Sequence, residues 1–194
     1  VTIPLRSPAD DVLARSTFQR WLWYASRRAG LRLDGIEDDF STPDRRADAL
    51  RKIAPVLRAS STEMETLLPK VEIVRYGCDE VIQRSGEVPA GMSFVVKGRV
   101  RIVVSGNDGE VIPVATLNEG DFLGQTALTR ESVLGTGYAM GEVTVLQIGR
   151  DVLERLVFRK PDLLQDLSHA IDERRDRTRR VVADYDAEVK HGTN

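Results

Sequence analysis

Between Val71 and Ile148 the sequence alternates short β-branched runs with glycine-containing turns, and this spacing restricts the possible folds more than any other feature. Twelve of the fifteen glycines of the chain lie between Gly77 and Gly149. Short runs separated by frequent turns are typical of an antiparallel barrel, roll or sandwich. The runs predict strands at Val71–Val74, Val81–Ile82, Ser93–Val96, Arg99–Val104, Val111–Ala115 and Glu142–Ile148.

One dipeptide within this region predicts a hairpin. Asp108-Gly109 stands between the runs Arg101–Val104 and Val111–Val114. An Asp-Gly pair readily adopts the positive backbone angles of a tight turn. We therefore expect these two runs to pair as neighbouring antiparallel strands.

Helical patterns precede the strand region. Ser7-Pro8 combines a capping hydroxyl with a proline suited to the first turn, and predicts a helix that ends near Arg28. Thr42-Pro43 begins a second helix in the same way. Ser60 and Glu63 form a capping box and predict a third, short helix.

The helical pattern returns after Gly149, breaks at Lys160-Pro161 and continues to about Lys190. The sequence therefore predicts an α+β fold, mainly β: an antiparallel β-roll or jelly roll flanked by N-terminal and C-terminal helices. Residues 1–41 are expected to form a helical extension and linker, and residues 42–190 one domain. Within that domain we expect helices at 42–69, the roll at 70–149 and the C-terminal helices at 150–190.

Composition and charge disfavour several classes of function. A net charge of −2 gives the chain no overall attraction to nucleic acid or to an anionic membrane. Cys78 has no partner for an intrachain disulfide and the two histidines do not complete a zinc site, so we expect no metal and no cofactor. Ser105, Thr129 and Cys78 have no histidine at a suggestive position, so we expect no enzymatic activity.

Two further observations concern location. The chain contains no apolar run of membrane-spanning length and no signal peptide, so we expect a cytoplasmic protein or the cytoplasmic part of a membrane protein. It begins with Val1 rather than Met, which suggests a fragment of a longer protein. An upstream part could then hold whatever this chain regulates.

From Ala49 to Ala170 the chain contains an ordered set of motifs whose glycines stand at characteristic places. The motifs are Leu50–Ile53, Ser61–Leu67, Gly77–Ile82, Gly86, Met92–Ile102, Asp108-Gly109 and Leu117–Gln125. Together they resemble the cyclic-nucleotide-binding domains, the family that includes the catabolite activator protein and the regulatory subunits of protein kinase A. The resemblance implies a β-roll and a non-catalytic, regulatory function.

The resemblance also implies a phosphate-binding cassette, here a short helix from Gly124 to Leu128 and the loop to Tyr138. In the family, helix-start amides and an arginine hold the cyclic phosphate, while a glutamate accepts a hydrogen bond from the ribose 2′-hydroxyl. An amide N–H group and a guanidinium suit an anion, and a carboxylate suits a hydroxyl. The ligand-binding residues implied for this chain are Gly124, Gln125, Thr126, Ala127, Arg130 and Thr136.

The cassette departs from the family pattern at two positions. Gln125 stands where the glutamate is expected, so its amide oxygen still accepts a hydrogen bond but carries no charge. Nine or ten residues further on, where the arginine is expected, the chain reads Ser132-Val-Leu-Gly-Thr136. Loss of a charge-assisted contact worth about 1.5 to 3 kcal/mol lowers affinity by about 10- to 100-fold. We therefore expect cyclic AMP or cyclic GMP to bind weakly or not at all.

Three alternatives stay open for the ligand. Arg130 lies inside the cassette and its long side chain could hold the phosphate from another direction, which would make the chain a true cyclic AMP or cyclic GMP sensor. A different small molecule could occupy the pocket. The domain could also be a ligand-free structural or oligomerisation module.

The expected partners follow from the two ends of the chain. Val1–Arg6 and Trp21–Ala29 resemble the end of the cytoplasmic vestibule of small-conductance mechanosensitive channels, which implies an attached membrane channel domain. Near the C-terminus, Arg174, Arg175 and Arg177 alternate with acidic residues at helical spacing, which favours a solvated helix face over direct nucleic-acid binding. We expect homo-oligomerisation through the helical parts.

Overall fold

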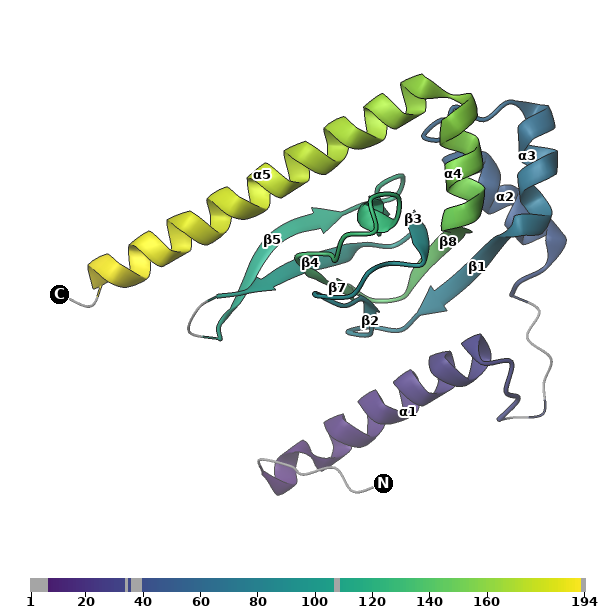
Figure 1. Cartoon of the computed structure of the whole chain (residues 1–194). Helices are drawn as coiled ribbons and strands as arrows, with labels where there is room; N and C mark the ends of the chain where they lie inside the picture. Colours follow the sequence, from purple (N-terminus) through teal and green to yellow (C-terminus); the bar gives the residue numbers. More distant parts are fainter. Residues whose placement is uncertain (1–6, 34, 36–39, 107–108, 193–194) are drawn as a thin grey trace.

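The computed structural model describes residues 7–33, 35, 40–106 and 109–192 (Figure 1). Eight strands form two four-stranded antiparallel sheets that face each other as a roll. One sheet has the order β1 (Val71–Tyr76), β8 (Val143–Gly149), β3 (Gly91–Lys97), β6 (Phe122–Leu123). The other has the order β2 (Val81–Gln83), β7 (Thr136–Ala139), β4 (Val100–Ser105), β5 (Val111–Leu117). The predicted roll is confirmed.

Helices flank the roll at both ends of the sequence, as predicted. The N-terminal elements are a 3₁₀ turn η1 (Pro8–Asp10), α1 (Asp11–Arg28), α2 (Pro43–Ile53), α3 (Ser61–Leu67) and a 3₁₀ turn η2 (Leu68–Lys70). A further 3₁₀ turn, η3 (Gln125–Ala127), lies between β6 and β7, and α4 (Arg150–Arg159) and α5 (Pro161–Gly192) follow the roll. The break between α4 and α5 falls at Lys160, because Pro161 has no N–H group to continue the ladder.

The predicted helix starts have the expected caps. The Thr42 side chain accepts a hydrogen bond from the backbone N–H of Arg45, and Ser60 with Glu63 forms a reciprocal capping box. These bonds satisfy N–H groups that the first turn of a helix cannot satisfy itself. The hairpin between β4 and β5 is confirmed by their antiparallel pairing, although Asp108 itself lies outside the described residues.

Residues of the first sheet alternate between two hydrophobic clusters, one on each face. Phe94 and Leu146 face α2 and α4, where Leu50 and Leu153 complete the cluster. Val95 and Val145 face the second sheet, and residues such as Val100 of β4 complete that cluster. Both faces carry buried hydrophobic residues, so this sheet joins the helices to the interior of the roll.

Helix α1 lies on the opposite side of the roll from α5 (Figure 1). Ala14, Phe18, Leu22 and Ala25 recur at helical spacing along α1, but Phe18 and Leu22 remain 39% and 44% exposed. Polar contacts attach α1 to the roll instead. Trp21 Nε1 donates to the Cys78 carbonyl at 3.0 Å, Tyr24 donates to Glu142 at 2.5 Å, and Arg28 reaches Glu80.

In the part of the chain that the structure describes, no helix is both long enough and apolar enough to cross a membrane. The same residues contain no group of three or more His, Cys, Asp or Glu side chains placed to hold a metal ion.

The Arg28–Glu80 pair should be the main energetic link between α1 and the roll. Glu80 is 7% exposed, accepts the backbone N–H of Gly77 at 2.6 Å and binds both terminal nitrogens of Arg28. Arg28→Ala should lower the free energy of unfolding by about 2 to 4 kcal/mol, because it leaves a buried carboxylate without its cation. Urea denaturation measures this loss. Arg15→Ala, which removes an exposed pair with Asp11, should leave the free energy of unfolding nearly unchanged.

The junction of α3 with the end of α4 should make stability depend on pH. The hydrogen bond from Lys160, together with that from the backbone N–H of Ser60, lowers the pKa of Glu63 to about 2. An unfolded glutamate has a pKa of about 4.3. The lowered pKa of Glu63 therefore stabilises the folded protein above that pH, and this contribution is lost as the pH falls toward about 2. Urea denaturation between these pH values should show a smaller loss for Glu63→Gln than for the wild-type chain. Glu65→Gln, on the exposed side of α3, should behave as wild type.

Candidate cassette site

The cassette, residues 124–136, is held at both ends by one side chain of β2. Gln83 Oε1 accepts the backbone N–H of Gly124 at 2.9 Å, and Gln83 Nε2 donates to the carbonyl of Gly135 at 3.0 Å. Gly124 has a φ of 72°, and a Cβ there would lie 2.4 Å from the carbonyl oxygen of Gly91. Only glycine fits this entry to the cassette without moving the backbone.

A small cavity, the cassette cavity, lies between the cassette, the roll and α5. Its volume is about 50 Å³. Its walls come from the roll (Gln83, Ile102, Leu123), the cassette (Gln125, Thr126, Ser132 to Gly135) and α5 (Ile171, Arg175, Thr178). Sites for drug-sized ligands usually measure about 300–1,000 Å³. A nucleotide-sized molecule therefore does not fit the cavity in this conformation.

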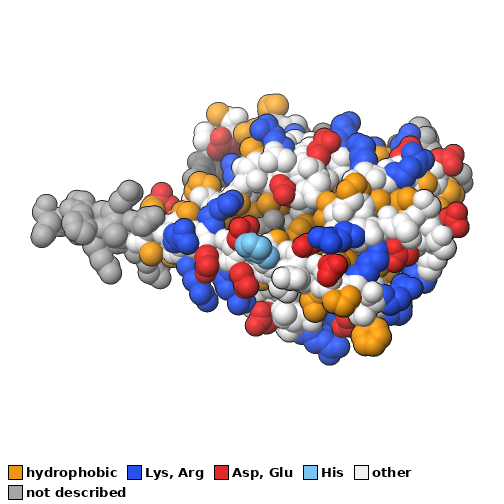
Figure 2. Space-filling view, turned by 90° about the horizontal axis from the view of Figure 1, so that it is seen from above, with side chains coloured by type: hydrophobic (Ala, Val, Ile, Leu, Met, Phe, Trp, Pro, Cys, Tyr) orange, Lys and Arg blue, Asp and Glu red, His pale blue; other side chains and the backbone are white. Residues whose placement is uncertain are grey.

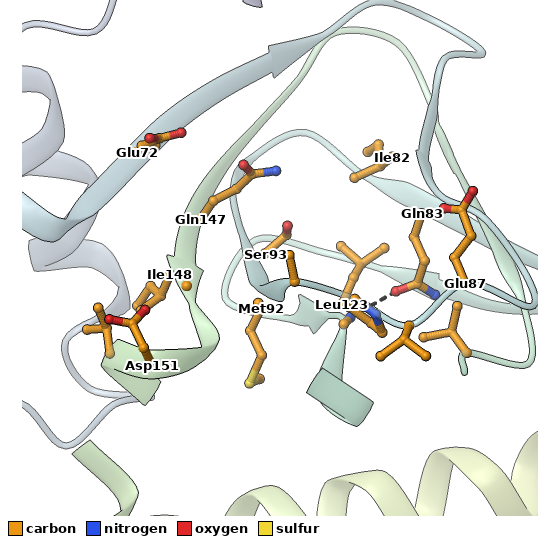
Figure 3. Close-up of a pocket in the computed structure, with 18 of the residues that line it drawn as sticks. Glu72, Ile82, Gln83, Glu87, Met92, Ser93, Leu123, Gln147, Ile148 and Asp151 are labelled. Carbon is orange, nitrogen blue, oxygen red and sulfur yellow. Dashed lines mark hydrogen bonds between the residues drawn. The ribbon is translucent and has the colours of Figure 1, made fainter. Parts of the chain in front are cut away.

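The six residues implied by the family resemblance have different surroundings. Gln125 and Thr126 line the cassette cavity, whereas Gly124 lines a larger cavity at the end of the roll (Figure 3). Ala127 of the cassette is fully buried. Thr136 lies on β7, where its hydroxyl accepts the backbone N–H of Ser85 at 3.1 Å.

Arg130 points away from the cassette cavity. Its side chain is 70% exposed, and its guanidinium lies 3.8 Å from Glu154 of α4. Arg130 is not among the residues that line either cavity. Its assignment to a phosphate stays a prediction, and in this structure the side chain would have to leave Glu154 to reach one.

The place where the family has its arginine contains no cation. Leu134 is 55% exposed, and a Cβ on Gly135 would lie 2.8 Å from Cγ2 of Ile102. Arg175 of α5 is the only basic side chain among the described residues that line the cassette cavity. Its guanidinium is 2.9 Å from Glu131, so its charge is already balanced by a carboxylate.

Sequence reasoning missed the contributions of Gln83 and Arg175. Gln83 immediately follows the predicted strand Val81–Ile82. A polar residue at that position was the available signal in the sequence for its contribution to the site. Arg175 lies in a run of alternating charges that looks like an ordinary solvated helix face. The position of that face relative to the cassette comes from the packing of α5.

The outer face of α5 has mixed charge. Figure 2 views the molecule from above and shows Lys and Arg side chains interspersed with Asp and Glu along this side. The ion pairs Arg175–Glu131 and Arg58–Asp166 belong to the described part of the helix. No single-sign patch of described residues is visible on this face to attract a polyanion.

Comparison with known proteins agrees with this architecture. Residues 73–160 match the family model of the cyclic nucleotide-binding domain. This stretch, just under half of the chain, is similar to that family and contains most of the β-roll. A curated relative, the cAMP-activated global transcriptional regulator CRP of Pasteurella multocida, is 26% identical over 122 residues, which cover 62% of this chain and 58% of CRP. This chain thus spans little more than half the length of the curated relatives it matches first.

Solved structures support the same fold for this roll. One is a regulatory subunit of a cAMP-independent protein kinase A from Trypanosoma cruzi bound to guanosine, with a TM-score of 0.58, 20% identity, and coverage of 78% of this chain and 53% of that one. Another is the Trypanosoma brucei counterpart, a triple mutant with an introduced arginine, bound to cAMP in its A site. Its TM-score is 0.56 at 18% identity, covering 76% of this chain and 53% of that chain. These identities establish the fold alone.

An unsatisfied hydroxyl inside the cassette generates a prediction about stability. Thr126 is 6% exposed, and its Oγ1 has no hydrogen-bond partner among the described residues. Burying such a group without a partner is unfavourable, so Thr126→Val should raise the free energy of unfolding by about 1 kcal/mol. Thermal or urea unfolding measures the change. The control Thr126→Ser keeps the hydroxyl and loses a methyl group, so this variant should not be more stable than the wild-type chain. A valine variant that is clearly less stable than the wild-type chain would contradict the prediction.

Proposed function

We propose that this chain is a non-catalytic regulatory module with weak or no affinity for cyclic AMP and cyclic GMP. The observation that carries the proposal is the absence of a cation at Leu134 and Gly135, where the family places its arginine. A cyclic phosphate in the cassette cavity would meet the neutral Gln125 and an Arg175 already paired with Glu131. Transfer of an anion from water to such a site is unfavourable.

The cassette cavity is better suited to an uncharged ligand, of which a nucleoside is the example we propose. Gln125 and Thr126 offer an amide and an unsatisfied hydroxyl, while Ile102 and Leu123 offer apolar surface. A nucleoside has hydroxyl groups and a ring but no phosphate. The guanosine complex of the Trypanosoma cruzi relative supports this choice, and so does the cAMP complex of a Trypanosoma brucei variant into which an arginine had been introduced.

Helix α5 is the element through which a ligand would act. Val181, Val182 and Tyr185 pack against the cluster inside the roll, while Ile171 and Thr178 close the cassette cavity. Since a nucleoside exceeds the volume of about 50 Å³, binding favours a conformation in which α5 has moved. The change would reach any domain attached to the chain.

We further propose that the regulated partner is a membrane channel domain upstream of Val1, and that the helical parts form a homo-oligomer. The likeness of Trp21–Ala29 to a channel vestibule supports the first idea; its other segment, Val1–Arg6, lies outside the described residues. The tight connection of α1 to the roll through Arg28 and Glu80 gives a route for coupling. Several apolar spans in the upstream coding sequence would support this assignment, and an upstream soluble domain would contradict it.

Thermal-shift titration tests the ligand proposal directly. The chain should be stabilised by millimolar guanosine or adenosine and not by cyclic AMP or cyclic GMP. A ligand at about 100 times its dissociation constant adds about 2.7 kcal/mol to the free energy of unfolding. Stabilisation by a cyclic nucleotide that Arg130→Ala abolishes would overturn the proposal in favour of the Arg130 sensor, and no stabilisation by any of the four would favour a ligand-free structural domain.

A matched variant tests the reason for the weak affinity. Leu134→Arg or Gly135→Arg supplies a guanidinium at the position expected from the family. At least one of them should tighten cyclic AMP binding by about tenfold or more, the worth of one charge-assisted contact. Leu134→Gln serves as the uncharged control. If neither arginine variant gains affinity while both remain folded, the missing cation is not the cause.

A further inference from the structure

Helix α1 carries a large share of the exposed apolar surface of the protein. Thirteen large hydrophobic side chains are exposed in the described structure, and five of them lie on this one helix: Val12, Leu13, Phe18, Trp21 and Leu22. Scattered exposed hydrophobic residues are normal in a folded protein, whereas a contiguous group of them marks a surface that another molecule covers. This distribution singles out α1 as a candidate interaction surface.

One side of α1 is already occupied by the roll. Arg20, Tyr24 and Arg28 recur every four residues along this side. The side chains of Arg20 and Tyr24 lie against Gly77, and Arg28 binds Glu80. Because each residue of an α-helix is rotated by about 100° from the one before it, these positions form a single line along the helix.

A second line of residues on α1 is apolar and remains open to solvent. Phe18, Trp21, Leu22 and Ala25 stand at positions i, i+3, i+4 and i+7, the spacing of one helix face. This α1 stripe is turned by about a quarter of a circle from the line that faces the roll. Trp21 belongs to both sides, because its indole N–H reaches the Cys78 carbonyl while the residue stays 40% exposed. Figure 1 shows α1 at one edge of the molecule, where a second helix can approach the stripe.

The α1 stripe is complementary to a second copy of itself when the two helices run in opposite directions. With a two-fold axis between Trp21 and Leu22, Phe18 of each copy lies opposite Ala25 of the other. A large side chain then meets a small one at both outer positions, and Trp21 and Leu22 of the two copies meet at the axis. Parallel helices would instead place Phe18 on Phe18 and Ala25 on Ala25, which makes the helix spacing uneven.

The charges at the ends of α1 favour the same antiparallel arrangement. Its beginning is acidic, with Asp10 and Asp11, and its last turn is basic, with Arg27 and Arg28. Antiparallel pairing places the acidic end of one helix beside the basic end of the other and opposes the two helix dipoles, whereas parallel pairing would bring like charges together. Asp11 and Arg28 also have partners within the chain, so these charges orient the helices rather than add a new ion pair.

We infer that the partner of the α1 stripe is α1 of a second copy of this chain, packed antiparallel in a two-fold symmetric dimer. The inference rests on the homo-oligomer proposed above and gives it a surface and an orientation. One helix from each copy makes a contact smaller than the roughly 1,200 to 2,000 Å² of stable protein interfaces. We therefore expect reversible association, with a dissociation constant on the order of 10 to 100 µM.

Sedimentation velocity of the complete 194-residue chain tests the surface. The wild-type chain should change from monomer to dimer as its concentration rises from about 5 to 500 µM, a range around the expected dissociation constant. Phe18→Glu places a charge at both outer positions of the contact and should weaken dimerisation by about tenfold or more. The control Phe158→Glu makes the same change at an 89% exposed residue of α4 and should dimerise like the wild-type chain. Urea denaturation verifies that both variants are folded.

A mixture of two variants tests the antiparallel orientation. Ala25→Lys, like Phe18→Glu, should dimerise poorly by itself. In a mixture of the two chains, antiparallel pairing places the new carboxylate opposite the new ammonium group at one outer position and leaves Phe18 opposite Ala25 at the other. The mixed dimer should therefore form more tightly than either variant dimer, by about threefold or more.

Four results would overturn the inference. A chain that stays monomeric throughout this concentration range would also contradict the proposed homo-oligomer. Dimerisation that Phe18→Glu leaves unchanged would mean that the oligomer uses another surface, and a mixed dimer no tighter than the variant dimers would mean that the orientation is wrong. Binding of a monomeric chain to anionic lipid vesicles, lost in Phe18→Glu, would assign the stripe to a membrane surface. Nucleoside titration of the same variants monitors the cassette cavity, so failure of the ligand proposal is distinguishable from failure at α1.

Discussion

The burial of one sheet on both faces is the constraint on which the rest of this structure depends. In β3, Phe94 packs toward α2 and α4 while its neighbour Val95 packs into the roll, and both are 0% exposed. Successive residues of a strand point to opposite faces, so the register of β3 against β8 fixes the helices and the second sheet together. Because α4 begins directly after β8, the same register also places the start of α5 relative to the cassette.

The two ends of the cassette are held by hydrogen bonds within the protein itself. Gln83 satisfies the N–H of Gly124 and the carbonyl of Gly135 from inside the protein, so the two ends of the cassette are held without a nucleotide. Fold and ligand preference are separable for this reason: the hydrogen bonds that maintain the loop are not those that would hold a phosphate. What lines the space beneath α5 is an amide, an unsatisfied hydroxyl and a paired guanidinium.

Local signals in the sequence were sufficient for most elements and insufficient for two short strands. Capping residues such as Thr42 and Ser60, and the β-branched runs, act over a few residues and predicted the helices and six of the strands. Strand β6 has two residues and β7 contains Gly137, so neither has a recognisable pattern. In the fold Gly137 has a packing reason, because a Cβ there would lie 2.9 Å from Leu123.

The sequence by itself determined the roll, its flanking helices and the replacement of the expected glutamate and arginine by Gln125 and an uncharged segment. Those are properties of composition, spacing and order along the chain. Tertiary structure alone decided that Arg130 faces α4, that Arg175 lines the cassette cavity, and that Glu72 faces a second, larger cavity. The physical reason is that a cavity is bounded by side chains distant in sequence, and its volume is what remains after sheets and helices have packed.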